Sequence, residues 1–339
     1  MPLRPLDNAL PSAEQPKKVA KVAASPSLSA KKAAAALAAA SRVNDENTPN
    51  PPPPEQSVEY VPSEDLAALM DPGSKIVVLL DELSSKDWIR GCEALNDLRR
   101  MALHHSSLLL PIFWKCGKAC KIDHSAKENW VMIIASLLMI RGNATTIIVK
   151  AMKSPRSALC KTSIMASADI FQSFGALLLS STEDNAFDQL LLQLLLKASQ
   201  DKKFVCEEAE KALVKMAMCM PPLPLLKKLQ SCVNHANLRV RAKAAISMSK
   251  CISKMDIEVM TEFGIATLLR VAAELLNDRL PEAREAARSI IITLHGEFSK
   301  NNNNLKDDKE SSASESWQDF CFVNLPPIAA QSVAKIISL

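Results

Sequence analysis

Histidine and cysteine side chains are the first candidates for chemistry in this sequence. Cys116, Cys120 and His124 recur every four residues, so a helix would place them on one face, where they could form part of a metal site. Structural zinc sites usually add a second ligand pair, so a stripe of reduced core cysteines is the favoured interpretation. His104 and His105 are not accompanied by a motif that supplies a nucleophile. The sequence therefore predicts no metal site and no catalytic residue.

The composition argues against several other kinds of site. Nine scattered cysteines without a Cys-x-x-Cys pair suit a reducing compartment better than a disulfide scaffold. The seven glycines stand alone, so no Gly-rich loop could cradle a phosphate or a dinucleotide. The longest charge-free apolar run, Val131–Ile140, is too short to cross a bilayer, and the N-terminus lacks the apolar core of a signal peptide. We expect a non-enzymatic protein without cofactor, small-molecule substrate or membrane insertion.

Positive charges recur just ahead of five similar segments, and they could attract an acidic surface. Each segment follows a short polar loop and carries small apolar residues at helical spacing. The cations near these loops are Lys86, Arg156, Lys202, Lys203, Arg239 and Arg279. Trp88 follows Asp87, which can cap a helix that begins there. Turns are often basic because they are wet, and Trp88 is explained equally well as a hydrophobic staple or as an interface anchor.

These loops belong to a sequence repeat. The five segments share a common position, occupied by Ile89, Leu159, Val205, Val240 and Ala283. The successive spacings are 70, 46, 35 and 43 residues. If the spacing of 70 holds two repeats, six units fit between Ser74 and Lys300.

Each unit is predicted to consist of two antiparallel helices. Apolar residues recur at intervals of three and four along 282–294, which indicates one buried helical face. The preceding helix is predicted over Ile257–Leu276, with Pro281 in the first turn of the second helix, where its missing N–H is not needed. Helix pairs that repeat at about 40 to 47 residues are typical of HEAT and armadillo solenoids. We therefore predict an all-α solenoid of about six helix pairs, whose equivalent loops form a basic strip along one edge.

The composition also divides the chain. Twelve of the 20 prolines fall in residues 1–72, and 1–71 is predicted to be a disordered basic arm that either adds attraction to an acidic partner or is only a solvated segment. Residues 72–300 form the predicted HEAT-repeat domain, and 301–316 a polar linker. Residues 317–339 carry a candidate helix, Ile328–Leu339. This last piece either docks back on the solenoid, which we favour, or recruits a partner protein through a groove.

Two stretches carry a family resemblance. They are Ser85-Lys86-Asp87-Trp88-Ile89-Arg90-x-x-Glu93-Ala94-Leu95-x-x-Leu98 and Asn237-Leu238-Arg239-Val240-Arg241-Ala242-Lys243-Ala244-Ala245. They resemble the TOG domain, especially its CLASP N-terminal and plant TORTIFOLIA-like types. Residues 153–159 look like the third-repeat loop of that type and 201–205 like the fourth, and the resemblance covers about residues 74–298. It implies six HEAT repeats that bind the αβ-tubulin dimer along the loops inside the repeats.

The resemblance also implies roles for individual residues. Trp88 would contact β-tubulin, with Lys86 beside it. The basic residues of the later loops would reach α-tubulin. Arg156, together with Lys202 or Lys203, would provide contacts in the middle of the domain.

The later loops carry the remaining implied contacts. Arg239 would be the contact of the fifth loop, and Arg279 belongs to the same edge. Arg241 would be either a further contact or a partly buried arginine that ties one repeat to the next. The stretch Ser106–Gly142 departs from the family pattern, so its loop is assigned no contact.

The predicted function is non-catalytic binding of αβ-tubulin and microtubules, at the microtubule cytoskeleton of the cytoplasm, to regulate their organisation or dynamics. The alternative is a generic HEAT-repeat scaffold that binds a different acidic protein, because solenoids host many functions on one architecture. Specific nucleic-acid binding is not expected. Residues 72–339 contain 34 basic and 28 acidic residues and lack the interleaved aromatic and basic residues that stack on bases.

Overall fold

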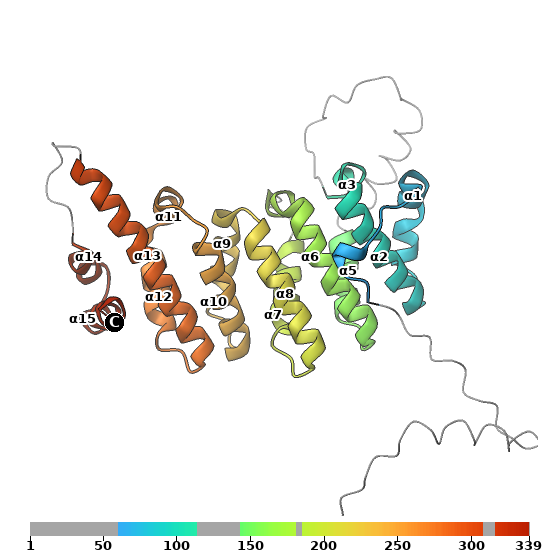
Figure 1. The fold of residues 1–339 in the computed structure, drawn as a ribbon. Helices are drawn as coiled ribbons and strands as arrows, with labels where there is room; N and C mark the ends of the chain where they lie inside the picture. Colours follow the sequence, from blue (N-terminus) through green and yellow to red (C-terminus); the bar gives the residue numbers. More distant parts are fainter. Residues whose placement is uncertain (1–59, 114–142, 181–184, 308–315, 339) are drawn as a thin grey trace, which may run out of the picture. The chain divides into compact units, whose positions relative to one another are not determined.

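The structure is a computed structural model that describes residues 60–113, 143–180, 185–307 and 316–338. Every regular element in these ranges is a helix (Figure 1), which confirms the all-α prediction. All of these helices belong to one compact structural unit, Ser57–Leu339. The helices are η1 (Ser63–Asp65), α1 (Pro72–Leu83), α2 (Trp88–His104), α3 (Ser106–Phe113), α5 (Asn143–Met152), α6 (Ser157–Ser180), α7 (Ala186–Lys197), α8 (Lys203–Cys219), α9 (Pro222–Cys232), α10 (Leu238–Ile252), α11 (Ile257–Phe263), α12 (Ile265–Leu275), α13 (Pro281–Asp307), α14 (Trp317–Asn324) and α15 (Pro327–Ile337).

The described helices form stacked pairs. The pairs are α1/α2, α5/α6, α7/α8, α9/α10, α12/α13 and α14/α15. The second helices pack on one another in chain order, from α2 through α6, α8 and α10 to α13 (Figure 1). Four of the predicted common positions are the third residue of a second helix, whereas Ile89 is the second residue of α2. The repeat register is therefore confirmed, with a shift of one residue in the first pair.

The position of the second repeat is a correction. Helix α2 packs directly on α6, so these two helices are neighbours in the stack although their common positions are 70 residues apart. Arg99 Nε of α2 donates to Asp169 Oδ2 of α6 at 2.7 Å, and Ser173 Oγ donates to the Ala102 carbonyl at 2.7 Å. The spacing of 70 residues is thus one step of the stack, and its extra length comes from α3 and from residues 114–142, which lie outside the described residues. The prediction of two repeats came from dividing the spacing of 70 residues by an average repeat length, which assumes that the chain contains no insertion.

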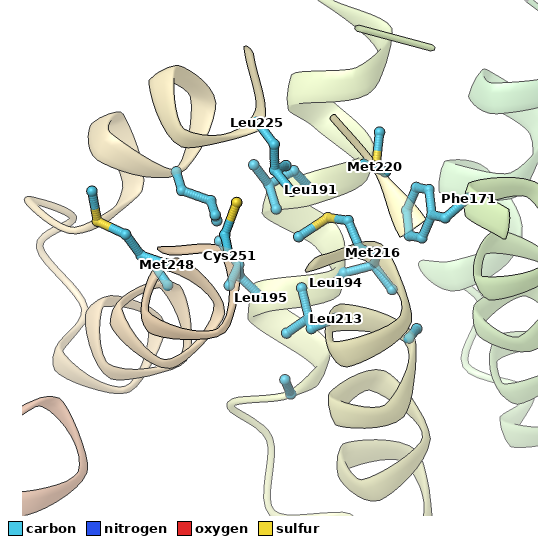
Figure 2. Close-up of a cluster of buried hydrophobic side chains, with 14 of the residues drawn as sticks. Phe171, Leu191, Leu194, Leu195, Leu213, Met216, Met220, Leu225, Met248 and Cys251 are labelled. Atoms are coloured by element: carbon cyan, nitrogen blue, oxygen red, sulfur yellow. The ribbon is translucent and has the colours of Figure 1, made fainter. Parts of the chain in front are cut away.

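A continuous apolar core runs through the stack from pair to pair, and Figure 2 shows the part of it around α7 and α8. In α7, Leu190, Leu191, Leu194 and Leu195 recur at helical spacing, and all four are buried. Figure 2 shows leucines of α7 beside Met216 of α8 and beside side chains of α9 and α10. A single pair could not bury its apolar face alone, so each pair depends on its neighbours for stability.

The segment just ahead of α1 is held on the stack. The Val61 carbonyl accepts from Arg99 Nη1 at 2.8 Å, and Ser63 Oγ donates to Asp169 Oδ1 at 2.7 Å. Leu66 is buried, and its carbonyl lies 2.7 Å from His104 Nε2. Residues 60–66, here called the N-terminal strap, therefore differ from the disordered arm predicted over 1–71. Proline-rich composition suggested a linker, but the buried ion pair of α2 and α6 supplies this segment with hydrogen-bond partners.

Two predicted helix boundaries also differ from the structure. The single helix predicted over Ile257–Leu276 is wrong, because it is broken into α11 and α12 at Gly264, whose φ is 104°. The backbone of an L-residue with a Cβ atom rarely adopts a φ in this range, so glycine is required at the break. Helix α13 begins at Pro281, as predicted, but it runs to Asp307 and takes in the first residues of the predicted linker 301–316. Neither proline nor glycine stands in 297–307 to stop the helix.

The two glycine positions predict stability changes of opposite sign. Gly264→Ala is expected to lower the free energy of unfolding by about 1–3 kcal/mol, because alanine is strained at positive φ. Gly296→Ala, inside α13, is expected to raise it by about 0.5–1 kcal/mol, because alanine favours a helix and the new methyl group meets nothing within 4 Å. Urea unfolding of both variants measures the difference. Equal effects of the two substitutions would contradict the helix break at Gly264.

The C-terminal helices dock on the end of the stack. Helices α14 and α15 pack on each other and on α12 and α13. Trp317 is buried, with its ring centroid 5.3 Å from those of His295 and Phe298 and 5.9 Å from that of Phe320. Docking of this segment on the solenoid is thus confirmed, and its second helix is Pro327–Ile337, close to the predicted 328–339.

Helix α6 is the longest apolar element of the described chain. By length and composition alone, Ser157–Leu179 could span a membrane. In the structure it is instead a core helix, packed on α2, α5 and α8. Asp169 in its middle is fully buried in an ion pair with Arg99. The sequence of this helix is not a charge-free run, because Lys161 and Asp169 interrupt it.

Candidate partner-binding edge

The loops inside the helix pairs lie along one edge of the stack. We call the loops 84–87, 153–156, 198–202, 233–237 and 276–280, with the first turn of the helix that follows each, the loop edge. Because the second helices pack side by side, their first turns are neighbours. Contacts between loops show this continuity: Arg156 lies over the Trp88 ring, Arg239 pairs with Asp201, and Arg241 pairs with Asp278.

The first two loops meet through Trp88. Asp87 Oδ1 accepts from the Ile89 N–H at 3.0 Å, which confirms the predicted cap of α2. Trp88, the first residue of that helix, is half-buried, and the Arg156 guanidinium lies 5.7 Å from the centroid of its ring. This geometry is a cation–π contact. One face of the indole is therefore engaged inside the molecule, while Lys86 and Arg156 are exposed beside it.

The third and fourth loops meet through Arg239. Its Nη1 donates to Asp201 Oδ1 at 2.7 Å and to the Ser199 carbonyl at 3.3 Å. Lys203 is 87% exposed, with its ammonium 3.8 Å from a Glu207 oxygen, and Lys202 is exposed with no ion pair among the described residues. Arg239 is thus partly neutralised by its own chain, whereas Lys202 and Lys203 carry the surplus positive charge of this part of the edge.

Arg241 ties the fourth loop to the fifth. Its Nε donates to Asp278 Oδ2 at 2.9 Å, and its Nη1 donates to the His235 carbonyl at 3.1 Å. Burial alone would raise the pKa of Asp278, but the Leu280 N–H and the Arg241 guanidinium together hold it below its usual value. Arg241 is therefore a tie between pairs, one of the two roles predicted for it. Arg279, in the fifth loop, is exposed.

Counted among the described loops, the loop with Arg156 is the second, the loop with Lys202 the third and the loop with Arg239 the fourth. The family resemblance numbers these loops the third, fourth and fifth, because it counts a loop within Ser106–Gly142, most of which lies outside the described residues. All the predicted cations of the edge nonetheless lie in these loops or in the adjoining first turns.

Sequence reasoning missed two features of the edge. One is the contact of Arg156 with Trp88, which joins residues 68 positions apart and follows only from the packing of α2 on α6. The other is Phe204, the second residue of α8, whose side chain is 42% exposed. An aromatic residue directly before the buried Val205 was a signal in the sequence that could have revealed it.

Cys116, Cys120 and His124 lie outside the described residues. The cysteines of the described ranges are free thiols, and burial raises the pKa of Cys251 and Cys321 to about 11, which disfavours the reactive thiolate. Within the same ranges, no group of three His, Cys, Asp or Glu side chains could hold a metal ion.

Comparisons with known proteins point to one family. The family model described as CLASP N terminal matches residues 123–318. A mouse protein (Mus musculus), TOG array regulator of axonemal microtubules protein 1, is 24% identical over 244 residues. The match covers 71% of this chain and 12% of that relative, so the chain spans only a small part of the relative's length.

Several solved structures contain similar helical stacks. The MAST/Orbit N-terminal domain has a TM-score of 0.46 at 12% identity and covers 77% of this chain and 95% of its own. A structure from work on microtubule plus end tracking by XMAP215, CLIP-170 and EB1 has a TM-score of 0.49 at 13% identity, with coverages of 80% and 94%. A crescerin structure, from a TOG domain array that regulates microtubules in the primary cilium, has a TM-score of 0.45 at 14% identity, with coverages of 77% and 91%.

Proposed function

The chain belongs to the CLASP N-terminal family of TOG domains, and on this premise we propose that it is a tubulin- and microtubule-binding protein that contacts tubulin through the loop edge. The family is non-catalytic, so the activity is binding alone. We further propose that the protein acts at microtubules in the cytoplasm and regulates their organisation or dynamics. A related mouse protein is named as a regulator of axonemal microtubules, which supports this proposal.

The observation that carries the proposal is the row of cations on neighbouring loops. Lys86, Arg156, Lys202 and Lys203 are exposed on three consecutive loops, held by helices that pack directly on one another. Cations fixed at regular spacing complement an acidic protein surface and speed its association. Trp88 adds a large side chain at the start of this row, where its free surface can be buried by the partner.

The mechanism is rigid presentation of this edge. The ties through Arg156, Arg239 and Arg241 link the first loop to the second, the third to the fourth and the fourth to the fifth. The packing of α6 on α8 holds the second loop beside the third, so the side chains of the edge keep their relative positions when a partner binds. Less conformational freedom is then lost on association. The shape of the edge would select one curvature of the tubulin dimer, because all loops must contact it together.

A direct test is size-exclusion chromatography of the full chain with unpolymerised tubulin at moderate salt. The wild type is expected to co-elute with tubulin, whereas Trp88→Ala and Arg239→Ala are each expected to weaken binding by about tenfold or more. Helical circular dichroism of both variants should remain unchanged, since neither side chain lies in the core. Binding that survives both substitutions would mean that tubulin contacts another surface.

A pelleting assay with microtubules separates the lattice from the free dimer. Deleting residues 1–56 removes the cationic arm and keeps the N-terminal strap, which Arg99 binds. We expect weaker pelleting of this deletion at low salt, because the arm attracts the acidic lattice by charge. Failure of the full chain to bind either tubulin or microtubules would favour the alternative, a scaffold for a different acidic protein.

A further inference from the structure

An exposed aromatic residue lies in the middle of the loop edge. Phe204 is the second residue of α8, and Arg239 is the second residue of α10. These two side chains therefore occupy the same place on neighbouring helices, and both are exposed. The pairing of Arg239 with Asp201 joins the two loops, so Phe204 and Arg239 belong to the same part of the loop edge.

Phe204 is not needed to fill the core. Its neighbour Val205 is only 2% exposed and packs in the apolar core, whereas Phe204 leaves 42% of its surface in water. By contrast, Trp88 at the first loop is half-buried and lies against Arg156. Phe204 therefore offers apolar surface at the loop edge, and a partner that covers this surface gains its burial.

The charges around Phe204 indicate what kind of surface would bury it. Asp201 is already paired with Arg239 at 2.7 Å, so it does not neutralise the lysines that follow it. Lys202 and Lys203 are exposed, and in the described part of the chain Lys203 pairs only with Glu207, at 3.8 Å. An apolar ring beside two available ammonium groups matches an apolar depression bordered by carboxylates.

We propose that Phe204, directly preceded by Lys202 and Lys203, is a second anchor of the loop edge, which inserts into an apolar depression with an acidic rim on tubulin. This inference rests on the proposed function and adds a contact that depends on apolar burial rather than on charge. The edge then has two aromatic anchors, Trp88 on the first loop and Phe204 on the third, with Arg156 between them.

The test compares Phe204→Ala with a matched control, Phe322→Ala, in the full chain. Phe322 lies on α14, away from the loop edge, and is 51% exposed. Both substitutions therefore remove a solvent-exposed phenyl ring. With purified αβ-tubulin dimer, Phe204→Ala is expected to weaken binding by about tenfold or more, and Phe322→Ala by less than about twofold. Phe204→Leu should restore much of the affinity. Equal binding of the two alanine variants would overturn the proposal.

Salt separates the aromatic contact from the charges. As salt rises, the loss caused by Lys202→Ala with Lys203→Ala should shrink, whereas the ratio between wild type and Phe204→Ala should stay constant. A Phe204 effect that disappears with salt would contradict insertion into an apolar depression.

The wild type and Trp88→Ala show which idea fails. If Trp88→Ala loses binding but Phe204→Ala does not, the tubulin-binding edge stands and the second anchor is wrong. If the wild type itself does not bind tubulin, the proposed function fails, and the inference falls with it.

Discussion

Asp169→Ala is expected to lower the free energy of unfolding by about 3–5 kcal/mol, the largest stability effect that we anticipate for a single substitution. The Asp169 carboxylate and the Arg99 guanidinium pair at 2.7 Å, and both side chains are fully buried. Removing the carboxylate leaves a buried cation without its counter-charge, and the protein matrix solvates such a charge poorly. Ser63 also loses the acceptor of its hydroxyl, so the N-terminal strap is weakened at the same time.

A surface ion pair provides the matched control. Lys228 and Asp188 lie 2.8 Å apart, but their side chains are 37% and 40% exposed, so Asp188→Ala should cost no more than about 1 kcal/mol. Urea unfolding of both variants, followed by circular dichroism, measures the difference. In a third variant, Arg99→Met with Asp169→Leu, part of the stability should return, because no unpaired charge is left. Equal losses for Asp169→Ala and Asp188→Ala would contradict the buried pair.

The same ion pair has a consequence for the loop edge. It joins the second half of α2 to the middle of α6. Trp88 begins α2, and the loop with Arg156 directly precedes α6. If the helices separate, the cation–π contact between Trp88 and Arg156 is lost as well. The stability of the stack and the geometry of the first two loops therefore depend on one buried interaction.

Much of the fold could be predicted from the sequence because its signals are local. Apolar residues at intervals of three and four, and caps such as Asp87, determine where each second helix begins. The packing of α2 on α6 could not be predicted in this way, because it depends on Arg99 and Asp169, two charged residues far apart in the chain. Charged residues usually lie on the surface, so a pattern of hydrophobicity assigns them there.

The candidate site, like the fold, could be predicted from the sequence only where its signals are local. The cations of the edge were identified because they precede the repeated segments, which is a local property. Whether each cation is available to a partner depends on contacts between loops. Arg241 is tied to Asp278 and Arg239 to Asp201, whereas Lys202 and Lys203 are left more available. The exposure of Phe204 likewise depends on what the folded stack leaves uncovered.

The largest effect on binding is expected for Lys202→Glu with Lys203→Glu. Each reversal replaces an attraction by a repulsion at the centre of the loop edge. Two charges about 4 Å apart in water interact by about 1 kcal/mol, so the double reversal should cost about 2–4 kcal/mol, on the order of 100-fold in affinity for tubulin. Surface plasmon resonance with immobilised tubulin dimer, at several salt concentrations, measures both the loss and its screening.

Lys250→Glu with Lys300→Glu is the control that separates local contact from total charge. Lys250 lies near the end of α10 and Lys300 late in α13, and both are exposed far along their helices from the loops. Each substitution lowers the net charge by two, so either double variant takes the chain from +4 to 0. Long-range attraction then weakens about equally in the two proteins, and only the edge variant also loses close contacts. Equal losses in the two variants would show that net charge, rather than the loop edge, determines binding, whereas a loss confined to Lys202 and Lys203 places the contact on the third loop.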